Sequence, residues 1–294
     1  MPGEIIDGRR ISAEIRQELA QRVAALAPQD IVPTLAGMLV GDDPGSSGYV
    51  RLKEKAALDA GLRAEMLRLP ADTSQQELLA TVDSLNRRSD VHGIFVQLPL
   101  PSHLDEEAAL AAVSPEKDVD GFHPMSVGRS WLGQDAFVPA TPAGIMEMLR
   151  RSGLAELRHR HAVIVNTDNL VGKPLAALLT RPDVGADVTL CSGDTPNLAR
   201  FTRQADLLVV AVNMPRFITA DMVKEGVVAV DFGSNYLDDP SSPQGRRLVG
   251  DIDFEPVRQK ATAITPVPGG AGPMTVTMLL AHTVLAAERR AHHA

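Results

Sequence analysis

The sequence of 294 residues is poor in cysteine and in aromatic side chains, and it has no long apolar run. Its one cysteine, Cys191, excludes an internal disulfide and a thiolate metal cluster, which fits a reducing cytoplasm. The longest apolar stretch, ADLLVVAV, is far shorter than the roughly 20 residues that span a bilayer. The N-terminal MPGEIIDGRR has no apolar signal core. We therefore expect a cytoplasmic protein with no membrane partner.

Basic residues are also scarce, because 29 Lys and Arg stand against 37 Asp and Glu, giving a net charge of -8. A duplex nucleic-acid partner would call for a basic excess, so none is expected. The sequence has no H-E-x-x-H, paired C-x-x-C, Walker loop or G-x-S-x-G. The sequence therefore lacks the signatures of a metal hydrolase, an NTPase and an α/β-hydrolase, and no metal is expected.

Helical and strand patterns alternate along the first half of the chain. Helices are expected over residues 11–27, 48–61 and 73–88, and strands over residues 31–40 and 93–98. Such alternation predicts a parallel sheet wrapped by helices. With 44% hydrophobic residues, the chain is long enough for two compact domains.

The pattern restarts near residue 140, where Thr141 and Pro142 suit a helix cap and a first-turn proline. Strands are then expected at AVIV, DVTLC, DLLVVAV and VVAVDFG, the succession of a Rossmann-like parallel sheet. The predicted fold is α/β, with an N-terminal substrate domain over residues 1–140 and a dinucleotide-binding domain over 141–273. We expect a cleft between the domains, and a last helix over 274–290 that packs back on the first.

Tyr49 and Lys53 lie four residues apart in PGSSGYVRLKEKAALDAGL, so a helix presents both side chains on one face. A phenol and an amine placed in this way can hold an aromatic substrate and move a proton. Three further segments suit such a site: VHGIFVQLPLP, PEKDVDGFHP and TPVPGGAGPMT. The set indicates an enzyme, although by residue type alone Lys53 could be a solvated surface lysine and Tyr49 a core tyrosine.

Seven segments together resemble the bifunctional methylenetetrahydrofolate dehydrogenase/cyclohydrolase family in order and spacing, over almost the whole chain. They are YVRLKEKA, GIFVQLPLP, KDVDGFHP, ATPAGI, VGKP, VGDIDF and TPVPGGAGPMT. The resemblance implies one-carbon folate metabolism: oxidation of 5,10-methylenetetrahydrofolate to the 5,10-methenyl form with NAD or NADP, then hydrolysis to 10-formyltetrahydrofolate at the same site. It also implies a homodimer, formed through the Rossmann sheet.

The resemblance assigns roles to residues of the first domain. Lys53 matches the family's proton-transfer lysine, Gln97 the amide that orients the lysine and the substrate, and Asp120 the acid that binds the pterin. Asp118, just upstream, is expected to be a turn residue. Positions that match folate-binding residues are Tyr49, Ser46, Pro268, Gly269 and Gly270. For Gln97, an alternative is that its amide only caps loose backbone groups at the strand end.

The dinucleotide half departs from the family pattern. The family has G-R-S after the first Rossmann strand and H-S-R-T or H-S-K-T after the second; this chain has N-T-D and S-G-D-T. The cations that would hold a 2'-phosphate are absent, and Asp194 can accept hydrogen bonds from ribose hydroxyls while repelling a phosphate. NAD is therefore favoured over NADP.

Other positions near the expected dinucleotide are also altered. Asn213 replaces the glycine of A-x-G-x-P and Ser234 the isoleucine of G-I-N, whereas Gly172 is kept at a helix start. Asparagine tolerates left-handed backbone angles, so the turns at 166 and 213 can survive. The predicted cofactor-binding residues are Asn166, Thr167, Asp168, Gly172, Ser192, Asp194, Asn213 and Ser234.

The same motifs allow three alternative interpretations. Loops that no longer admit a dinucleotide would leave the cyclohydrolase step alone. A non-catalytic folate-binding protein would not need Lys53. A dehydrogenase of the shikimate or amino-acid type shares the architecture, but QLPLP and DVDGF disfavour it. We favour a retained but altered dinucleotide site.

Overall fold

The computed structural model describes residues 1–242 and 245–291 and forms two compact units. The six-stranded unit comprises Met1–Ser12 and Thr141–Thr275. The three-stranded unit comprises Ala13–Ala140 and the chain from Val276 onward. The unit boundaries fall within or next to three helices, α1 (Gly8–Leu26), α6 (Ala140–Arg151) and α10 (Gly272–Ala291).

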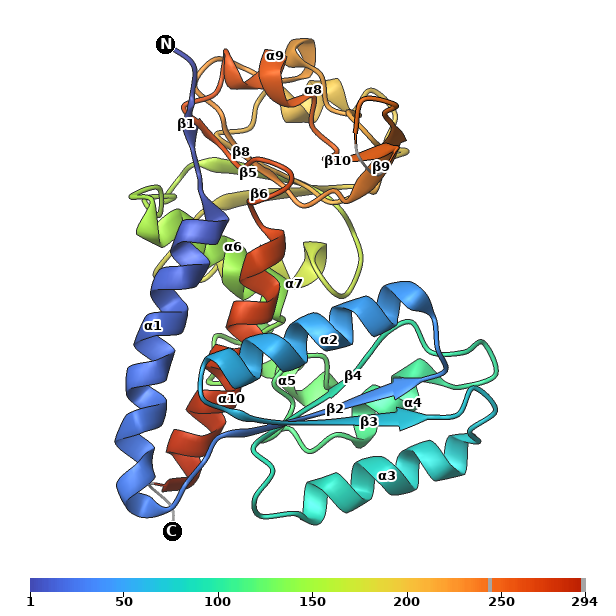
Figure 1. Cartoon of the computed structure of the whole chain (residues 1–294). Helices are drawn as coiled ribbons and strands as arrows, with labels where there is room; N and C mark the ends of the chain where they lie inside the picture. The colour runs from blue at the N-terminus through green and yellow to red at the C-terminus, as the bar shows by residue number, and fades with distance from the viewer. Residues whose placement is uncertain (243–244, 292–294) are drawn as a thin grey trace. The chain divides into compact units, whose positions relative to one another are not determined.

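The three-stranded unit is built on a parallel sheet in the order β3-β2-β4. Its strands are β2 (Thr34–Val40), β3 (Arg63–Leu69) and β4 (Gly93–Val96). Parallel neighbours need crossover connections, which α2 (Pro44–Asp59) and α3 (Gln75–Arg87) provide. Figure 1 shows α2 along one side of this sheet and α3 along the other. The remaining helical elements are η1 (Ala27–Gln29), α4 (Glu106–Ala112) and α5 (Pro124–Trp131).

Local signals fix where the two crossover helices begin. Asp43 caps α2 by accepting from the backbone N–H of Ser46 at 2.8 Å, with Pro44 in the first turn. Because of this cap, α2 begins four residues before the expected residue 48. Ser74 and Glu77 form a capping box at the start of α3, within the expected range.

The core of this unit lies between the sheet and α3. Met38 of β2, Val82 of α3 and Ile94 of β4 belong to one cluster of buried apolar side chains. The last helix also packs here: a ring nitrogen of His282 lies 2.9 Å from the carbonyl of Val119.

The six-stranded unit carries an all-parallel sheet in the order β1-β11-β8-β7-β5-β6. Its strands are β1 (Glu4–Ile5), β5 (His161–Val165), β6 (Asp187–Cys191), β7 (Leu207–Val210), β8 (Val228–Asp231) and β11 (Ala263–Ile264). The other elements are α7 (Gly172–Leu179), α8 (Ala199–Thr202), η2 (Ala220–Met222), α9 (Phe254–Arg258) and the antiparallel pair β9 (Asn235–Asp238) and β10 (Arg246–Val249). The predicted α/β class with a Rossmann-like parallel sheet is confirmed.

The first twelve residues, which are expected in the N-terminal domain, pack with the six-stranded unit. The reason is β1, whose residues Glu4 and Ile5 pair in parallel with Ala263 and Ile264 at the edge of the sheet. A strand of two residues has no periodicity that the sequence could reveal.

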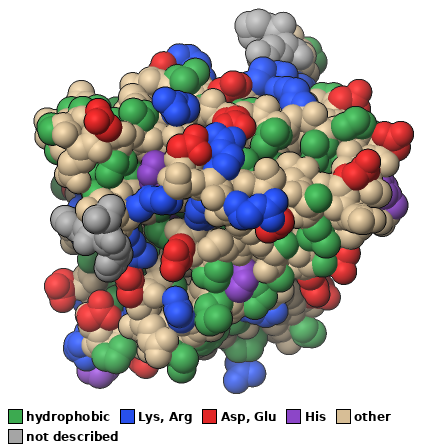
Figure 2. All heavy atoms as spheres, turned by 90° about the horizontal axis from the view of Figure 1, so that it is seen from below, with side chains coloured by type: hydrophobic (Ala, Val, Ile, Leu, Met, Phe, Trp, Pro, Cys, Tyr) green, Lys and Arg blue, Asp and Glu red, His purple; other side chains and the backbone are tan. Residues whose placement is uncertain are grey.

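Charges of both signs are mixed on one face of the molecule. Figure 2 shows Lys and Arg side chains interspersed with Asp and Glu on the face that it draws. In the described part of the chain, no helix combines the length and apolar character needed to cross a bilayer.

Candidate active site and dinucleotide site

Lys53 lies on α2 and is buried, with 8% of its surface exposed. Its Nζ lies 4.0 Å from the centroid of the Phe95 ring in β4. No hydrogen bond or ion pair to Nζ occurs within residues 1–242 and 245–291. A solvated surface lysine is thereby excluded, and the amine is left available to a ligand.

Asp120 is a buried carboxylate of the same unit, with 8% exposure. Burial raises its pKa, while the nearby charge of Lys53 opposes that rise, so the two side chains interact electrostatically. The described residues supply no hydrogen bond to this carboxylate. A buried carboxylate in this condition is suited to accept hydrogen bonds from a bound molecule.

Asp118 differs from Asp120 although only one residue separates them. Its carboxylate accepts from the backbone N–H groups of Gly121, Phe122 and His123 at 2.9 to 3.1 Å. It therefore organises the turn after Asp120, as predicted, and its acceptor capacity is used within the protein.

Gln97 follows β4 at the carboxyl end of the strand. Its Nε2 donates to the carbonyl of Leu98 at 2.7 Å, whereas its buried Oε1 has no hydrogen-bond partner among the described residues. The NH₂ group of the amide therefore bonds to the local backbone, as the capping alternative expects. The amide oxygen is a further buried polar atom, and it can accept a hydrogen bond from a bound molecule.

The two other residues predicted near the folate lie on α2 with Lys53. Tyr49 is 55% exposed, which excludes a core tyrosine, and Ser46 is buried in the first turn beside its cap Asp43. The loop of Pro268, Gly269 and Gly270 belongs to the six-stranded unit.

A cavity of about 350 Å³ in the six-stranded unit brings together most of the predicted cofactor residues. It lies where β5 has β6 on one side and β7 on the other, the point at which open α/β sheets bind dinucleotides. Of the predicted residues, Gly172 and Ser234 do not line it. The lining residues are Asn166, Thr167, Asp168, Ser192, Gly193, Asp194, Ala211, Val212, Asn213 and Met214.

The lining is acidic. Asp168 and Asp194 are its only ionisable residues, and no Lys, Arg or His is among them. The hydroxyl of Ser192 donates to the carboxylate of Asp194, which fixes that side chain. These groups suit the hydroxyls of a ribose, and they offer nothing to neutralise a 2'-phosphate.

Family models match both halves of the chain. The tetrahydrofolate dehydrogenase/cyclohydrolase catalytic domain matches residues 6–120, and the NAD(P)-binding domain of the same name matches residues 139–291. The chain belongs to the tetrahydrofolate dehydrogenase/cyclohydrolase family. The resemblance seen in its motifs is therefore confirmed, and the shikimate-type alternative is set aside.

Named relatives agree over the full length. Bifunctional protein FolD 1 of Myxococcus xanthus is 53% identical over 285 residues, which are 97% of each chain. The crystal structure of bifunctional FolD from Campylobacter jejuni, at 44% identity, gives a TM-score of 0.92 and covers 97% of this chain and 99% of that one. The FolD structure from Trypanosoma brucei, complexed with NADP and an inhibitor, gives 0.93 at 38% identity over both whole chains.

Two structurally important residues of this FolD-family chain were not singled out from its sequence. The first is Phe95, two residues before Gln97 and so on the same face of β4. Its ring is 1% exposed under the Lys53 amine. Gly37 of β2 makes room for it, because a Cβ there would lie 2.3 Å from the ring.

The second is Asp251, which is fully buried and lies in the VGDIDF segment. Its carboxylate accepts from the backbone N–H groups of residues 212, 213 and 214 at 2.6 to 3.0 Å. It therefore shapes the loop that lines the dinucleotide cavity. Asn213 has a φ of 55°, as the expected left-handed turn requires, whereas Asn166 is not left-handed.

The loop of Pro268, Gly269 and Gly270 is tightly packed against its own unit. A Cβ on Gly270 would lie 2.6 Å from the Cβ of Thr265, and one on Gly8 would lie 1.9 Å from the carbonyl oxygen of Gly270. Gly269 has a φ of 114°, which L side chains rarely adopt. These glycines are thus required by the fold of the loop itself.

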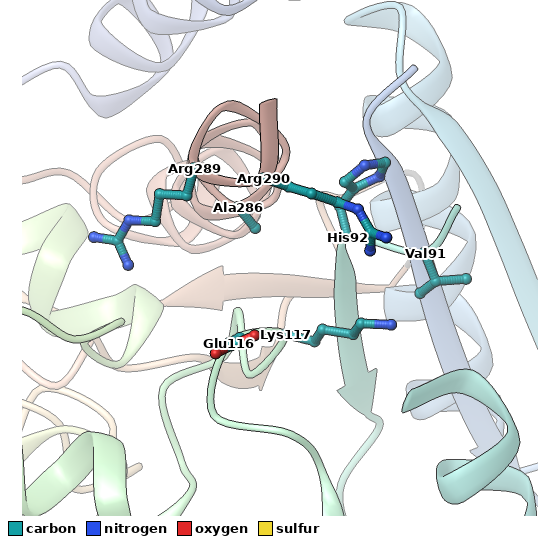
Figure 3. Close-up of a pocket in the computed structure, with 7 residues that line it drawn as sticks. All are labelled: Val91, His92, Glu116, Lys117, Ala286, Arg289 and Arg290. Carbon is teal, nitrogen blue, oxygen red and sulfur yellow. The ribbon is translucent and has the colours of Figure 1, made fainter. Parts of the chain in front are cut away.

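A larger cavity, of about 670 Å³, lies in the three-stranded unit and includes none of the predicted site residues. His92 precedes β4 and Gln97 follows it, so the cavity lies at the other end of that strand. Figure 3 shows Arg289 and Arg290 leaving α10 in different directions, with Arg290 toward His92. Burial, followed by the charges of Arg290 and Lys117, lowers the pKa of His92 to about 4.

Proposed function

We propose that this FolD-family chain hydrolyses 5,10-methenyltetrahydrofolate with Lys53 as the proton carrier. The observation that carries the proposal is the Lys53 amine, which is buried over Phe95 and has no hydrogen bond to any of the described residues. Burial of such a group without a partner costs free energy, and function is a sufficient reason to keep it.

The neighbouring polar groups fit the remaining parts of the reaction. Water adds to the amidinium carbon of the substrate, and Lys53 transfers the proton that addition and ring opening require. The unpaired Oε1 of Gln97 accepts from the lysine or from the water, and so orients them. The carboxylate of Asp120 accepts from the adjacent amino and ring N–H donors of a pterin, a pairing that a carboxylate makes well. Tyr49 supplies an aromatic face for the folate.

We further propose NAD as the dinucleotide of the oxidation step. The cavity at β5 offers Ser192 and Asp194 to the ribose and no cation to a 2'-phosphate. Bound nicotinamide would accept the hydride from the methylene carbon; the protein's part is to hold it. The acidic lining also favours the second candidate, a chain in which hydrolysis outweighs oxidation.

A spectroscopic assay tests these proposals together. Methylenetetrahydrofolate is supplied with NAD or with NADP, the methenyl product is followed by its absorbance, and its enzyme-dependent decay is measured separately. We expect a larger kcat/KM with NAD. A larger value with NADP would refute the cofactor proposal without touching hydrolysis, and loss of both activities would refute the whole assignment.

We also propose that the enzyme is a homodimer that pairs through the Rossmann sheet. Of the two outer strands, β1 has two residues, whereas β6 has five and, within the described part of the chain, pairs only with β5. Leu190 of β6 is 37% exposed. A strand edge of this kind presents unpaired backbone groups that a second copy can cover.

A further inference from the structure

The turn between β5 and α7 satisfies its own backbone donors. Asp168 Oδ1 accepts from the N–H groups of Leu170 at 2.9 Å and Val171 at 2.7 Å. Asn166 Oδ1 accepts from Gly172 at 2.7 Å, and the Asp168 carbonyl accepts from Lys173 at 3.1 Å. In a dinucleotide-binding sheet these helix-start donors are the ones that face a pyrophosphate. Here every one of the four is already bonded.

The carboxylate is also held in place. Asn166 Nδ2 donates to Asp168 Oδ2 and to the carbonyl of Ala211, both at 2.8 Å. Asn166 is 8% exposed, so the side chain that holds the Asp168 carboxylate is itself buried. Gly172 leaves space for it, since a Cβ there would lie 2.1 Å from the Asn166 carbonyl oxygen.

No cation of the cavity offsets the charge of Asp168. The other ionisable residue in the lining is Asp194, and the ammonium of Lys173 is engaged with the Asn169 side chain at 2.7 Å. An anion entering the cavity therefore meets two carboxylates and a helix start with no free donor among its first amides.

We propose that Asp168 is a built-in substitute for the dinucleotide pyrophosphate, and that it weakens the binding of NAD and NADP alike. The inference rests on the proposed dinucleotide site, but it concerns affinity and not the choice between the two cofactors. Asp168 and Asp194 thereby have separate functions: Asp194 selects against the 2'-phosphate, and Asp168 sets how much of either cofactor is bound. The oxidation step is limited by cofactor binding, while hydrolysis is not.

Asp168→Ser is the decisive variant. A hydroxyl can still cap the turn by accepting from Val171, the charge is gone, and Asn166 Nδ2 keeps its bond to Ala211. Asp168→Asn removes the same charge, but its NH₂ group would face the NH₂ group of Asn166, so the hydrogen bond between the two side chains would be lost. This variant therefore tests whether any gain in cofactor affinity requires that hydrogen bond. Asp187→Asn is the matched control, because Asp187 is an exposed carboxylate at the opposite end of β6 from Ser192.

Dissociation constants for NAD and NADP are measured by fluorescence or calorimetric titration, and thermal unfolding checks each fold. For Asp168→Ser we expect both constants to fall about threefold to tenfold, and no change for Asp187→Asn. The gain should shrink at high ionic strength, because Asp168 is exposed and its repulsion is screened.

Unchanged or weaker binding of both cofactors by folded Asp168→Ser would overturn the proposal. So would a gain confined to NADP, which would make Asp168 a selectivity residue. A gain that persists undiminished in high salt would do so too, because it would show that shape and not charge is responsible. In each case the proposed function is tested separately, by comparing the wild-type kcat/KM with NAD to that with NADP.

Discussion

At the scale of single residues, Lys53 carries the clearest prediction. Lys53→Met keeps an unbranched apolar stem over Phe95 but removes the amine. We expect the cyclohydrolase kcat to fall by about 10² to 10⁴, the usual contribution of a general acid or base, with the fold retained. The measurement is the decay of methenyltetrahydrofolate, corrected for its spontaneous hydrolysis.

Lys55 provides the matched control. It is exposed and pairs with Asp59 one helical turn away, so Lys55→Met should leave the rate within twofold of wild type, as expected for a solvated pair. Full hydrolysis by folded Lys53→Met would remove the lysine from the mechanism.

Asp231 carries a prediction about pH and stability. Burial raises its pKa to about 7, against the opposing effect of backbone N–H groups from Ile252, Asp251 and Gly233. The folded chain therefore favours the protonated carboxyl. This contribution to stability is complete below the ordinary pKa of about 4 and is lost as the pH rises through about 7.

The check is chemical unfolding of wild type and Asp231→Asn between pH 4.5 and 8. The free energy of unfolding of wild type, minus that of the variant, should decrease with rising pH and level off above about 7. A flat difference would mean that the three backbone N–H groups outweigh burial and keep the carboxylate charged.

Residue roles that depend on local pattern could be predicted from the sequence, and those that depend on tertiary contacts could not. Asp118 was assigned to a turn because its neighbours in the chain are its partners. Phe95 and Asp251 were missed because what they contact, Lys53 and the 212–214 loop, is remote in sequence. The cap by Asp168 was missed because N-T-D says nothing of where the amides that follow it point.

At the scale of elements, the packing of β2 against β4 positions Phe95 under the proposed catalytic lysine. Gly37→Ala places a Cβ 2.3 Å from the Phe95 ring and 2.6 Å from the sulfur of Met66. We expect a loss of about 1 to 3 kcal/mol in the free energy of unfolding, the usual cost of overpacking. A lower kcat for hydrolysis should accompany it, because a displaced Phe95 no longer supports Lys53. Denaturant unfolding and the hydrolysis assay measure the two effects.

Gly48→Ala makes the same chemical change where the Cβ meets nothing within 4 Å. Because alanine favours the helix, this variant should be as stable as wild type or up to about 1 kcal/mol more stable. Equal effects of the two substitutions would show that β2 and β4 can adjust, and that the glycine is not needed for the site.

Elements were predictable where their signals were strong. The amphipathic pattern over residues 73–88 located α3 within two residues at each end. Three of the predicted Rossmann strands, β5, β7 and β8, were found because buried parallel strands are continuous apolar runs. The fourth, β6, is a partly exposed edge strand with the mixed sequence DVTLC. The two-residue strands β1 and β11 were not found, since only their pairing defines them.

At the scale of the whole molecule, the sequence predicted two domains and a last helix that packs on the first, but it gave no sign of the N-terminal strand. The N-terminal strand belongs to the six-stranded unit, while the described residues of α10 beyond Thr275 belong to the three-stranded one. Arg22 of α1 holds Glu288 of α10 through two hydrogen bonds of 2.8 and 2.6 Å. Such contacts between chain segments over 260 residues apart have no signature in local periodicity.

The proposed homodimer gives the last prediction. If a second copy covers the free edge of β6, Leu190→Lys places a charge in the interface, and burying an unpaired charge is costly. We expect light scattering to show a dimer for wild type and a monomer for this variant at the same concentration. Hydrolysis should persist, since Lys53, Gln97 and Asp120 all lie in the other unit of the same chain.

Leu58→Lys, at an exposed leucine of α2, is the matched control and should remain dimeric. A Leu190→Lys dimer as stable as wild type would locate the interface elsewhere, and a monomeric wild type would exclude it.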